Sequence, residues 1–158
     1  MYNILCIKRV TDNYYYLECL LLNIIEKLNR ILDKVEKPAR YVGGELNMCI
    51  KDPTNVEIRF LYAFPDAYEV GMSHLGSTIL YNMTNERADT YAERAFAPFP
   101  DMQKKMEEFQ IPLYSLETYT PADSFDIIGF NLSYEMCYTT VLSMIKLSGL
   151  PIKANERD

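Results

Sequence analysis

The sequence lacks most of the residues from which single-chain metal and catalytic sites are built. It has no tryptophan, one histidine (His74), and four cysteines that lie far apart (Cys6, Cys19, Cys49 and Cys137). Because structural zinc and iron–sulfur sites need closely spaced cysteine or histidine ligands, this chain alone is not expected to hold either. Free thiols in a reducing compartment are the expected state of the cysteines.

Long hydrophobic runs and basic clusters are also missing. The stretch from Leu20 to Ile25 is far shorter than the roughly 20 apolar residues of a membrane-spanning helix. Glu18 and Glu26 interrupt what would be the core of a signal peptide. The net charge of −6 argues against nucleic-acid or anionic-membrane partners. We therefore expect a cytoplasmic protein with an acidic, solvated surface.

The composition is that of a soluble globular protein, with 49% apolar and 24% charged residues. Apolar residues repeat at helical spacing from Leu17 to Lys34, which predicts an amphipathic helix that ends near Pro38. An extended segment follows, in which Gly43 and Gly44 mark a turn. We divide the chain into an N-terminal helix and arm, residues 1–50, and a domain, residues 51–158.

Strand and helix patterns alternate in that domain. The predicted strands are Ile58–Phe64, Asp89–Ala97, Ile111–Leu116 and Asp126–Leu132. Helices are expected after Ser73 as N-cap, over Asp101–Phe109 behind Pro100, and from Glu135 to a stop at Gly149. This order predicts an α/β fold with an open, mostly parallel, Rossmann-like sheet flanked by helices, with the N-terminal helix added outside it. A further strand would be expected beyond Asp158, so we expect the sequence to continue.

Ligands of open α/β sheets bind beyond the carboxyl ends of the strands. The segment Pro65–Ser73, interpreted as a loop, and the junction Asn131–Glu135 would share one edge of the sheet. The predicted binding residues are Tyr68, Glu69, Gly71, Ser73, His74, Gly76, Asn131, Ser133, Tyr134 and Glu135.

The chemistry of these residues stays open at this stage. His74 can serve as a ligand, a proton donor or a residue that begins a helix, and Asp66 and Glu69 as ligand or turn groups. No Walker loop, GxGxxG or nucleophile elbow is present, so no complete catalytic set is found.

Four blocks in the same order resemble a family of uncharacterised bacterial radical SAM proteins. These blocks are residues 35–47, Phe64–Gly76, Glu93–Met102 and Phe125–Glu135. In that family the N-terminal region is similar to a cobalamin-binding, Rossmann-like domain. It precedes a barrel whose CxxxCxxC motif holds a [4Fe–4S] cluster that cleaves S-adenosylmethionine.

The resemblance implies an accessory domain of a radical SAM enzyme, with that barrel as its partner. The domain would bind cobalamin or help to hold substrate. The alternative is a docking domain without a cofactor. The cobalamin motif DxHxxG would place Asp at position 72 and Gly at position 77, where this chain has Met72 and Ser77. Many cobalamin-type domains of radical SAM proteins lack that motif and still carry the cofactor.

Overall fold

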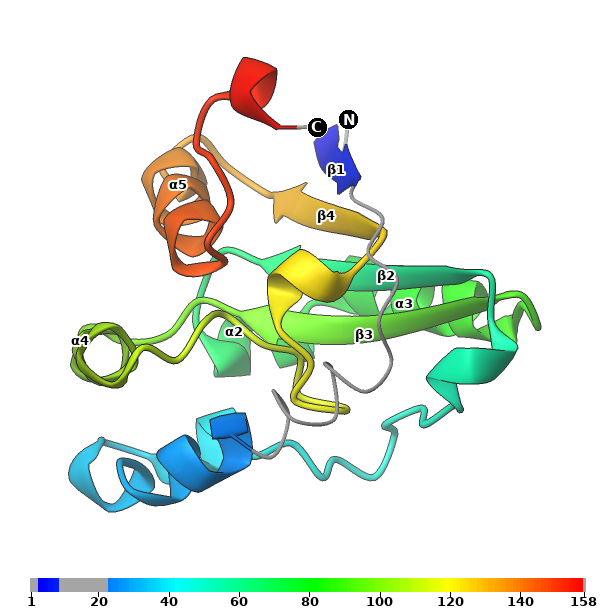
Figure 1. The fold of residues 1–158 in the computed structure, drawn as a ribbon. Coiled ribbons are helices and arrows are strands. Elements are labelled where there is room, and N and C mark those ends of the chain that lie inside the picture. The colour runs from blue at the N-terminus through cyan, green and yellow to red at the C-terminus, as the bar shows by residue number, and fades with distance from the viewer. Residues whose placement is uncertain (1–2, 9–22, 158) are drawn as a thin grey trace.

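A computed structural model of the chain describes the backbone of residues 3–8 and all of residues 23–157. Its centre is a four-stranded sheet in the order β1-β4-β2-β3 (Figure 1). The strands are β1 (Asn3–Lys8), β2 (Ile58–Phe64), β3 (Thr90–Phe96) and β4 (Ile127–Leu132). β2 pairs in parallel with both β3 and β4, while β1 adds an antiparallel edge beside β4. The predicted open, mostly parallel α/β sheet is confirmed.

Four α-helices connect or follow the parallel strands. They are α2 (Tyr68–Ser73), α3 (Leu75–Glu86), α4 (Pro100–Phe109) and α5 (Cys137–Leu147). Residues 23–29 form a further helical segment. Short 3₁₀ turns occur at Leu32–Lys34, Pro38–Tyr41, Pro53–Asn55, Ala122–Ser124 and Ala154–Glu156. None of the helices in the described part of the chain has the length and apolar character needed to cross a membrane.

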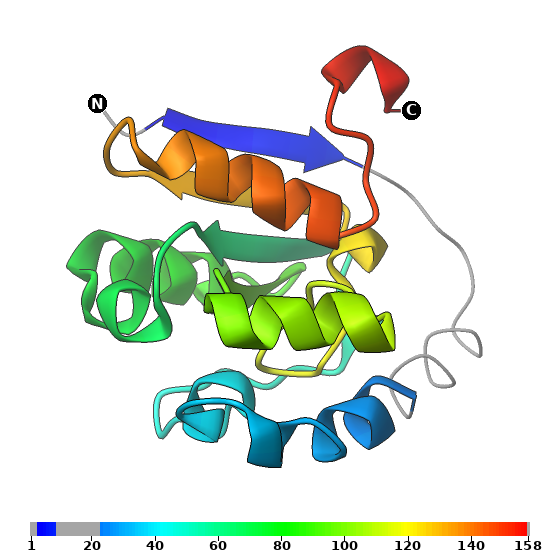
Figure 2. The ribbon, with the colours of Figure 1, turned by 90° about the vertical axis from the view of Figure 1, so that its left-hand side faces the viewer.

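The direction of the crossovers places the helices on two faces of the sheet. The chain moves from β2 to β3 through α3 and then back past β2 to β4 through α4. Because parallel crossovers are right-handed, opposite directions place α3 and α4 on opposite faces. α5 lies beside α4, and residues 23–41 lie along the far side of α4 (Figure 2).

The core is concentrated on the face covered by α4 and α5. One cluster joins β2 and β4 to α5 through residues such as Leu61, Phe130 and Met144, each at most 1% exposed. A second cluster joins α4 to the N-terminal segment through Met102, Met106, Leu28, Ile31 and neighbouring residues.

The opposite face is covered more thinly. Tyr81 is the one buried residue of α3, and it lies against the guanidinium of Arg94 from β3. Alternation along β2 directs Phe60 and Tyr62 to the same face as α3, and both are only half-buried. The apolar side chains of α3 are exposed, at 71% for Leu75, 46% for Ile79, 38% for Leu80 and 58% for Met83.

Four local predictions are wrong: one strand, one loop, one N-cap and the end of the first helix. Ile111–Leu116 forms one isolated bridge, Tyr114 to Pro121, and no strand, because its N–H groups bond to different elements. Leu113 donates to Leu147, Ser115 to Thr120 and Leu116 to Arg94.

The segment Pro65–Ser73 is also not simply a loop, because residues 68–73 form α2. The N-cap of α3 is His74, whereas Ser73 donates its hydroxyl to Val70 O. The predicted first helix ends earlier than Pro38, with a turn after residue 29, and its start at Leu17 lies outside the described residues.

Candidate functional site at the carboxyl edge of the sheet

A crevice of about 190 Å³ opens where β2, β3 and β4 end. Its walls come from the segment after β2, the segment after β3 and the start of α5. The lining residues are Pro65, Asp66, Ala67, Ala97, Pro98, Phe99, Pro100, Tyr134 and Thr140. The helices that follow the adjacent strands β2 and β4, α3 and α5, lie on opposite faces of the sheet, so this is the topological switch point at which α/β folds bind ligands.

Asp66 and Tyr134 are hydrogen-bonded to each other across this crevice. Asp66 Oδ1 accepts the N–H of Ala67 at 2.7 Å, and Asp66 Oδ2 accepts the hydroxyl of Tyr134 at 2.8 Å. This hydrogen bond raises the pKa of Tyr134 to about 12. Two segments that follow different strands are thereby linked at the rim.

His74 lies deeper, at the start of α3. Its Nδ1 accepts the N–H of Ser77 at 3.1 Å, which places the ring proton on Nε2. The Ser77 hydroxyl lies 2.9 Å from Nδ1, and the ring packs on Phe64 with centroids 5.3 Å apart. His74 therefore acts as the N-cap of α3 through its imidazole.

Asn131 of β4 completes this cluster. Its amide nitrogen lies 3.2 Å from Ser77 Oγ and 3.4 Å from His74 Nδ1. Among the predicted site residues, the structure thus brings His74 and Asn131 together, and Ser77 connects them.

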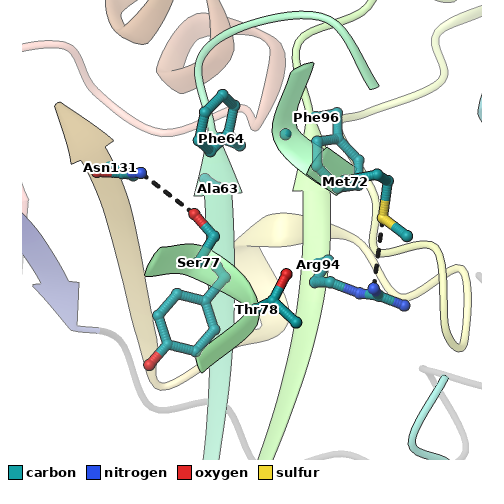
Figure 3. Close-up of a pocket in the computed structure, with 10 residues that line it drawn as sticks. Ala63, Phe64, Met72, Ser77, Thr78, Arg94, Phe96 and Asn131 are labelled. Atoms are coloured by element: carbon teal, nitrogen blue, oxygen red, sulfur yellow. Dashed lines mark hydrogen bonds between the residues drawn. The ribbon is translucent and has the colours of Figure 1, made fainter. Parts of the chain in front are cut away.

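A small cavity lies below this cluster, between α2, α3 and the sheet (Figure 3). Its volume of about 20 Å³ has room for about one water molecule. Phe64 and Phe96 form apolar walls, and Asn131 and Arg94 bring polar groups from β4 and β3.

Arg94 is held there by an unusual set of partners. Its Nε donates to Glu117 at 2.7 Å and its Nη1 points to the sulfur of Met72 at 3.4 Å. Its Nη2 lies 3.6 Å from Glu45 Oε2 and makes no hydrogen bond. Burial raises the pKa of the Glu117 carboxyl to about 6, against the opposing effect of Arg94.

Tyr68 and Glu69 lie away from the crevice and hold the N-terminal arm. The Tyr68 hydroxyl donates to Glu45 Oε1 at 2.8 Å, and burial with this bond raises its pKa to about 12. Glu69 accepts two bonds from Arg40 Nε at 2.8 and 3.0 Å, which lower the pKa of its carboxyl. Asp66 and Glu69 therefore face different partners.

The remaining predicted residues divide between exposed and packed positions. Ser73, Ser133 and Glu135 are exposed. Gly71 is buried, and a Cβ there would lie 2.3 Å from the ring of Phe96 and 3.0 Å from that of Phe64. A Cβ on Gly76 would lie 3.0 Å from His74 Cε1. The missing side chain of Gly71 thus makes room for the protein's own aromatic rings.

This geometry does not match a built cobalamin site. The space beside Gly71 is filled by the rings of Phe96 and Phe64, and the cavity below α3 has room for about one water molecule. His74 Nδ1 is already used to cap α3. The crevice of about 190 Å³ is also below the roughly 300–1,000 Å³ of typical small-molecule sites. We therefore assign no step to cobalamin.

No group of three or more His, Cys, Asp or Glu side chains placed to hold a metal ion occurs among the residues that the structure describes. Cys49 and Cys137 are free thiols, half-buried and buried respectively.

Sequence reasoning did not identify Ser77, Arg94 or Glu117 as part of the region. Ser77 is an ordinary polar residue of a helix, and the partner of Arg94 comes from a connection 23 residues further along the chain. No local pattern indicates either contact.

Comparison with known proteins gave one match. The family model described as "Radical SAM proteins, N-terminal" matches residues 76–158, slightly more than half of the chain. The match begins at Gly76, the last residue of the second block that carries the resemblance, and contains α3 from that residue on, β3, α4, β4 and α5. The chain matches no curated protein and no solved structure.

Proposed function

Since this chain belongs to the family of N-terminal regions of radical SAM proteins, we propose that it is a non-catalytic accessory domain that docks on the radical SAM barrel of the same protein. The observation that carries the proposal is the exposed apolar face of α3. A helix that packs only on its own domain directs its apolar stripe inward. In α3 the apolar residues Leu75, Ile79 and Met83 point outward, and Tyr81 alone is buried.

The lack of charged residues along most of α3 supports the same proposal. From Leu75 to Asn85 the helix has no charged side chain, in a chain with 24% charged residues. Interface cores are depleted in charge and enriched in methionine and aromatic residues. Leu80 lies next to Tyr62, whose hydroxyl contacts Leu80 O at 3.4 Å, so the apolar surface continues from α3 onto the sheet. We call this surface, made by Phe60, Tyr62, Ile79, Leu80 and Met83, the α3 face.

The first turn of α3 lies at the carboxyl edge of the sheet, where the crevice also opens, because His74 begins α3 and contacts Asn131 near the end of β4. A barrel that extends from the α3 face to the first turn of α3 would bring its own site to this edge of the sheet. The domain would then help to enclose substrate without supplying a catalytic group.

The test is co-purification with the barrel of the full-length protein, expressed as a separate chain. We expect a stable complex with the unchanged domain and at least tenfold weaker binding for the double variant Ile79→Glu, Met83→Glu. The matched control is Leu142→Glu, at an apolar α5 residue of similar exposure, 47%. Equal binding of the double variant and the control would contradict docking through the α3 face.

Cobalamin binding, which the family resemblance implies, is tested by titrating cobalamin into the purified chain. Because aromatic rings fill the space beside Gly71, we expect no saturable spectral change at high micromolar cobalamin. A saturable change would restore cofactor binding as the function.

A further inference from the structure

The crevice at the carboxyl edge has an unusual supply of hydrogen-bonding groups. Nucleotide and phosphate sites in α/β folds present free backbone N–H groups to an anion. Here three of the lining residues, Pro65, Pro98 and Pro100, have no N–H at all.

The N–H groups of neighbouring lining residues are already used inside the protein. Ala67 N donates to Asp66 Oδ1 at 2.7 Å, and Ala97 N donates to Phe64 O and Asp66 O, each at 3.1 Å. Phe99 N donates to the hydroxyl of Tyr41 at 3.3 Å. These walls therefore offer a ligand few donors.

Acceptors and negative charge are available in their place. The carboxylate of Asp66 uses one oxygen for Ala67 N and one for the Tyr134 hydroxyl, and each carboxylate oxygen has lone pairs for a second bond. The nearby cation, Arg40, lies 3.8 Å from the Phe99 ring centroid and is buried. It binds Glu69 through Nε and Nη2, while its buried Nη1 has no hydrogen-bond partner.

We propose that the crevice binds the ammonium group of a primary amine, held by Asp66 and closed in by Tyr134 and Phe99. Asp66 supplies the charged hydrogen bond, and the prolines and Phe99 pack on the carbon atoms next to the nitrogen. A phosphate or carboxylate would meet the Asp66 carboxylate and few free donors, so the crevice selects against anions. Amine binding in the crevice and docking of a barrel on the α3 face are independent of each other.

The proposal is tested by NMR titration of the isotope-labelled 158-residue chain with n-butylammonium chloride. Sodium butyrate and 1-butanol are the probes matched in carbon chain. We expect saturable shifts of the Asp66, Ala97 and Phe99 amides with butylammonium, and at least tenfold weaker effects with the other two.

Two variants separate binding at Asp66 from general attraction to an acidic protein. Asp66→Asn keeps an oxygen that can accept Ala67 N–H but removes the charge, and it should weaken butylammonium binding at least tenfold. Asp33→Asn removes the same charge at an exposed position in the N-terminal segment and should leave binding unchanged.

Tyr134→Phe frees Asp66 Oδ2, so binding of butylammonium should be equal or tighter. Equal binding of butyrate, butanol and butylammonium would overturn the proposal. So would unchanged binding in Asp66→Asn or lost binding in Tyr134→Phe.

Discussion

The two faces of the sheet differ in what covers them. On one face α4, α5 and the N-terminal segment bury two core clusters, one with Phe130 and Met144 and the other with Met102. On the other face α3 buries Tyr81 and leaves Ile79, Leu80 and Met83 exposed. The comparison teaches that the first face holds the fold together, while the second leaves an apolar surface exposed, which we propose docks on a partner.

The largest expected effect is on the core face. Phe130→Ala removes a fully buried ring between β4 and α5 and should lower the free energy of unfolding by about 3–5 kcal/mol. Since small domains are stable by only about 5–15 kcal/mol, this variant should be close to unfolding in water. Urea denaturation followed by circular dichroism measures the change. A loss below about 1 kcal/mol would mean that this face is not the core.

An intermediate effect is expected at Glu117, which lies buried beside Arg94. Because its folded pKa is raised from 4.5 to about 6, the stability it contributes is fully present below about pH 4.5 and is lost as the pH rises through about 6. A shift of that size corresponds to about 2 kcal/mol. The difference in unfolding free energy between wild type and Glu117→Gln, measured from pH 4 to 7.5, should fall with rising pH. A flat difference would show that the carboxyl keeps its ordinary pKa.

Gly71 tests the packing between α2 and the sheet. Gly71→Ala places a methyl group against Phe96 and should cost about 1–3 kcal/mol, because the rings must move. Val70→Ala, in the same helix at an exposed position, is the control and should change stability by less than about 1 kcal/mol. If both variants lose the same amount, the close approach at Gly71 does not constrain α2.

The smallest effect on stability belongs to the α3 face. Met83→Ala should change the free energy of unfolding by less than about 0.5 kcal/mol, because its side chain is 58% exposed. The unchanged chain should bind an apolar fluorescent dye at this surface, and the double variant Ile79→Glu, Met83→Glu should bind less of it. A large loss of stability in Met83→Ala would show that α3 is covered within this chain.

Most of the fold could be predicted from sequence because the strands are buried or half-buried and compositionally distinct. β2, β3 and β4 were each predicted to within about two residues, and α4 was located by Pro100 and Asp101. β1 was not predicted, because the apolar residues among residues 1–13 follow neither the strand nor the helix spacing clearly. Ile111–Leu116 was taken for a strand because a buried irregular connection is as apolar as a strand.

The site was harder to predict, because its contacts join residues far apart in the sequence. The position of His74 at a strand–helix junction was recognised, but its role as N-cap depends on Ser77 and Asn131. The apolar spacing Leu75, Ile79, Met83 correctly indicated a helix, but spacing alone does not say which partner the apolar stripe faces. The cytoplasmic location stays a prediction. Cobalamin binding stays a prediction of the family resemblance alone, and the aromatic rings that fill the space beside Gly71 argue against it.

The measurement that tests the central claim most directly is amide hydrogen exchange of α3 and β2. The 158-residue chain is compared with a longer protein that carries both this domain and a radical SAM barrel. We predict that exchange of Leu75–Glu86 slows at least tenfold in the longer protein, while α4 and α5 exchange at the same rate in both. Unchanged exchange along α3, with protection appearing on α4 and α5, would contradict docking through the α3 face.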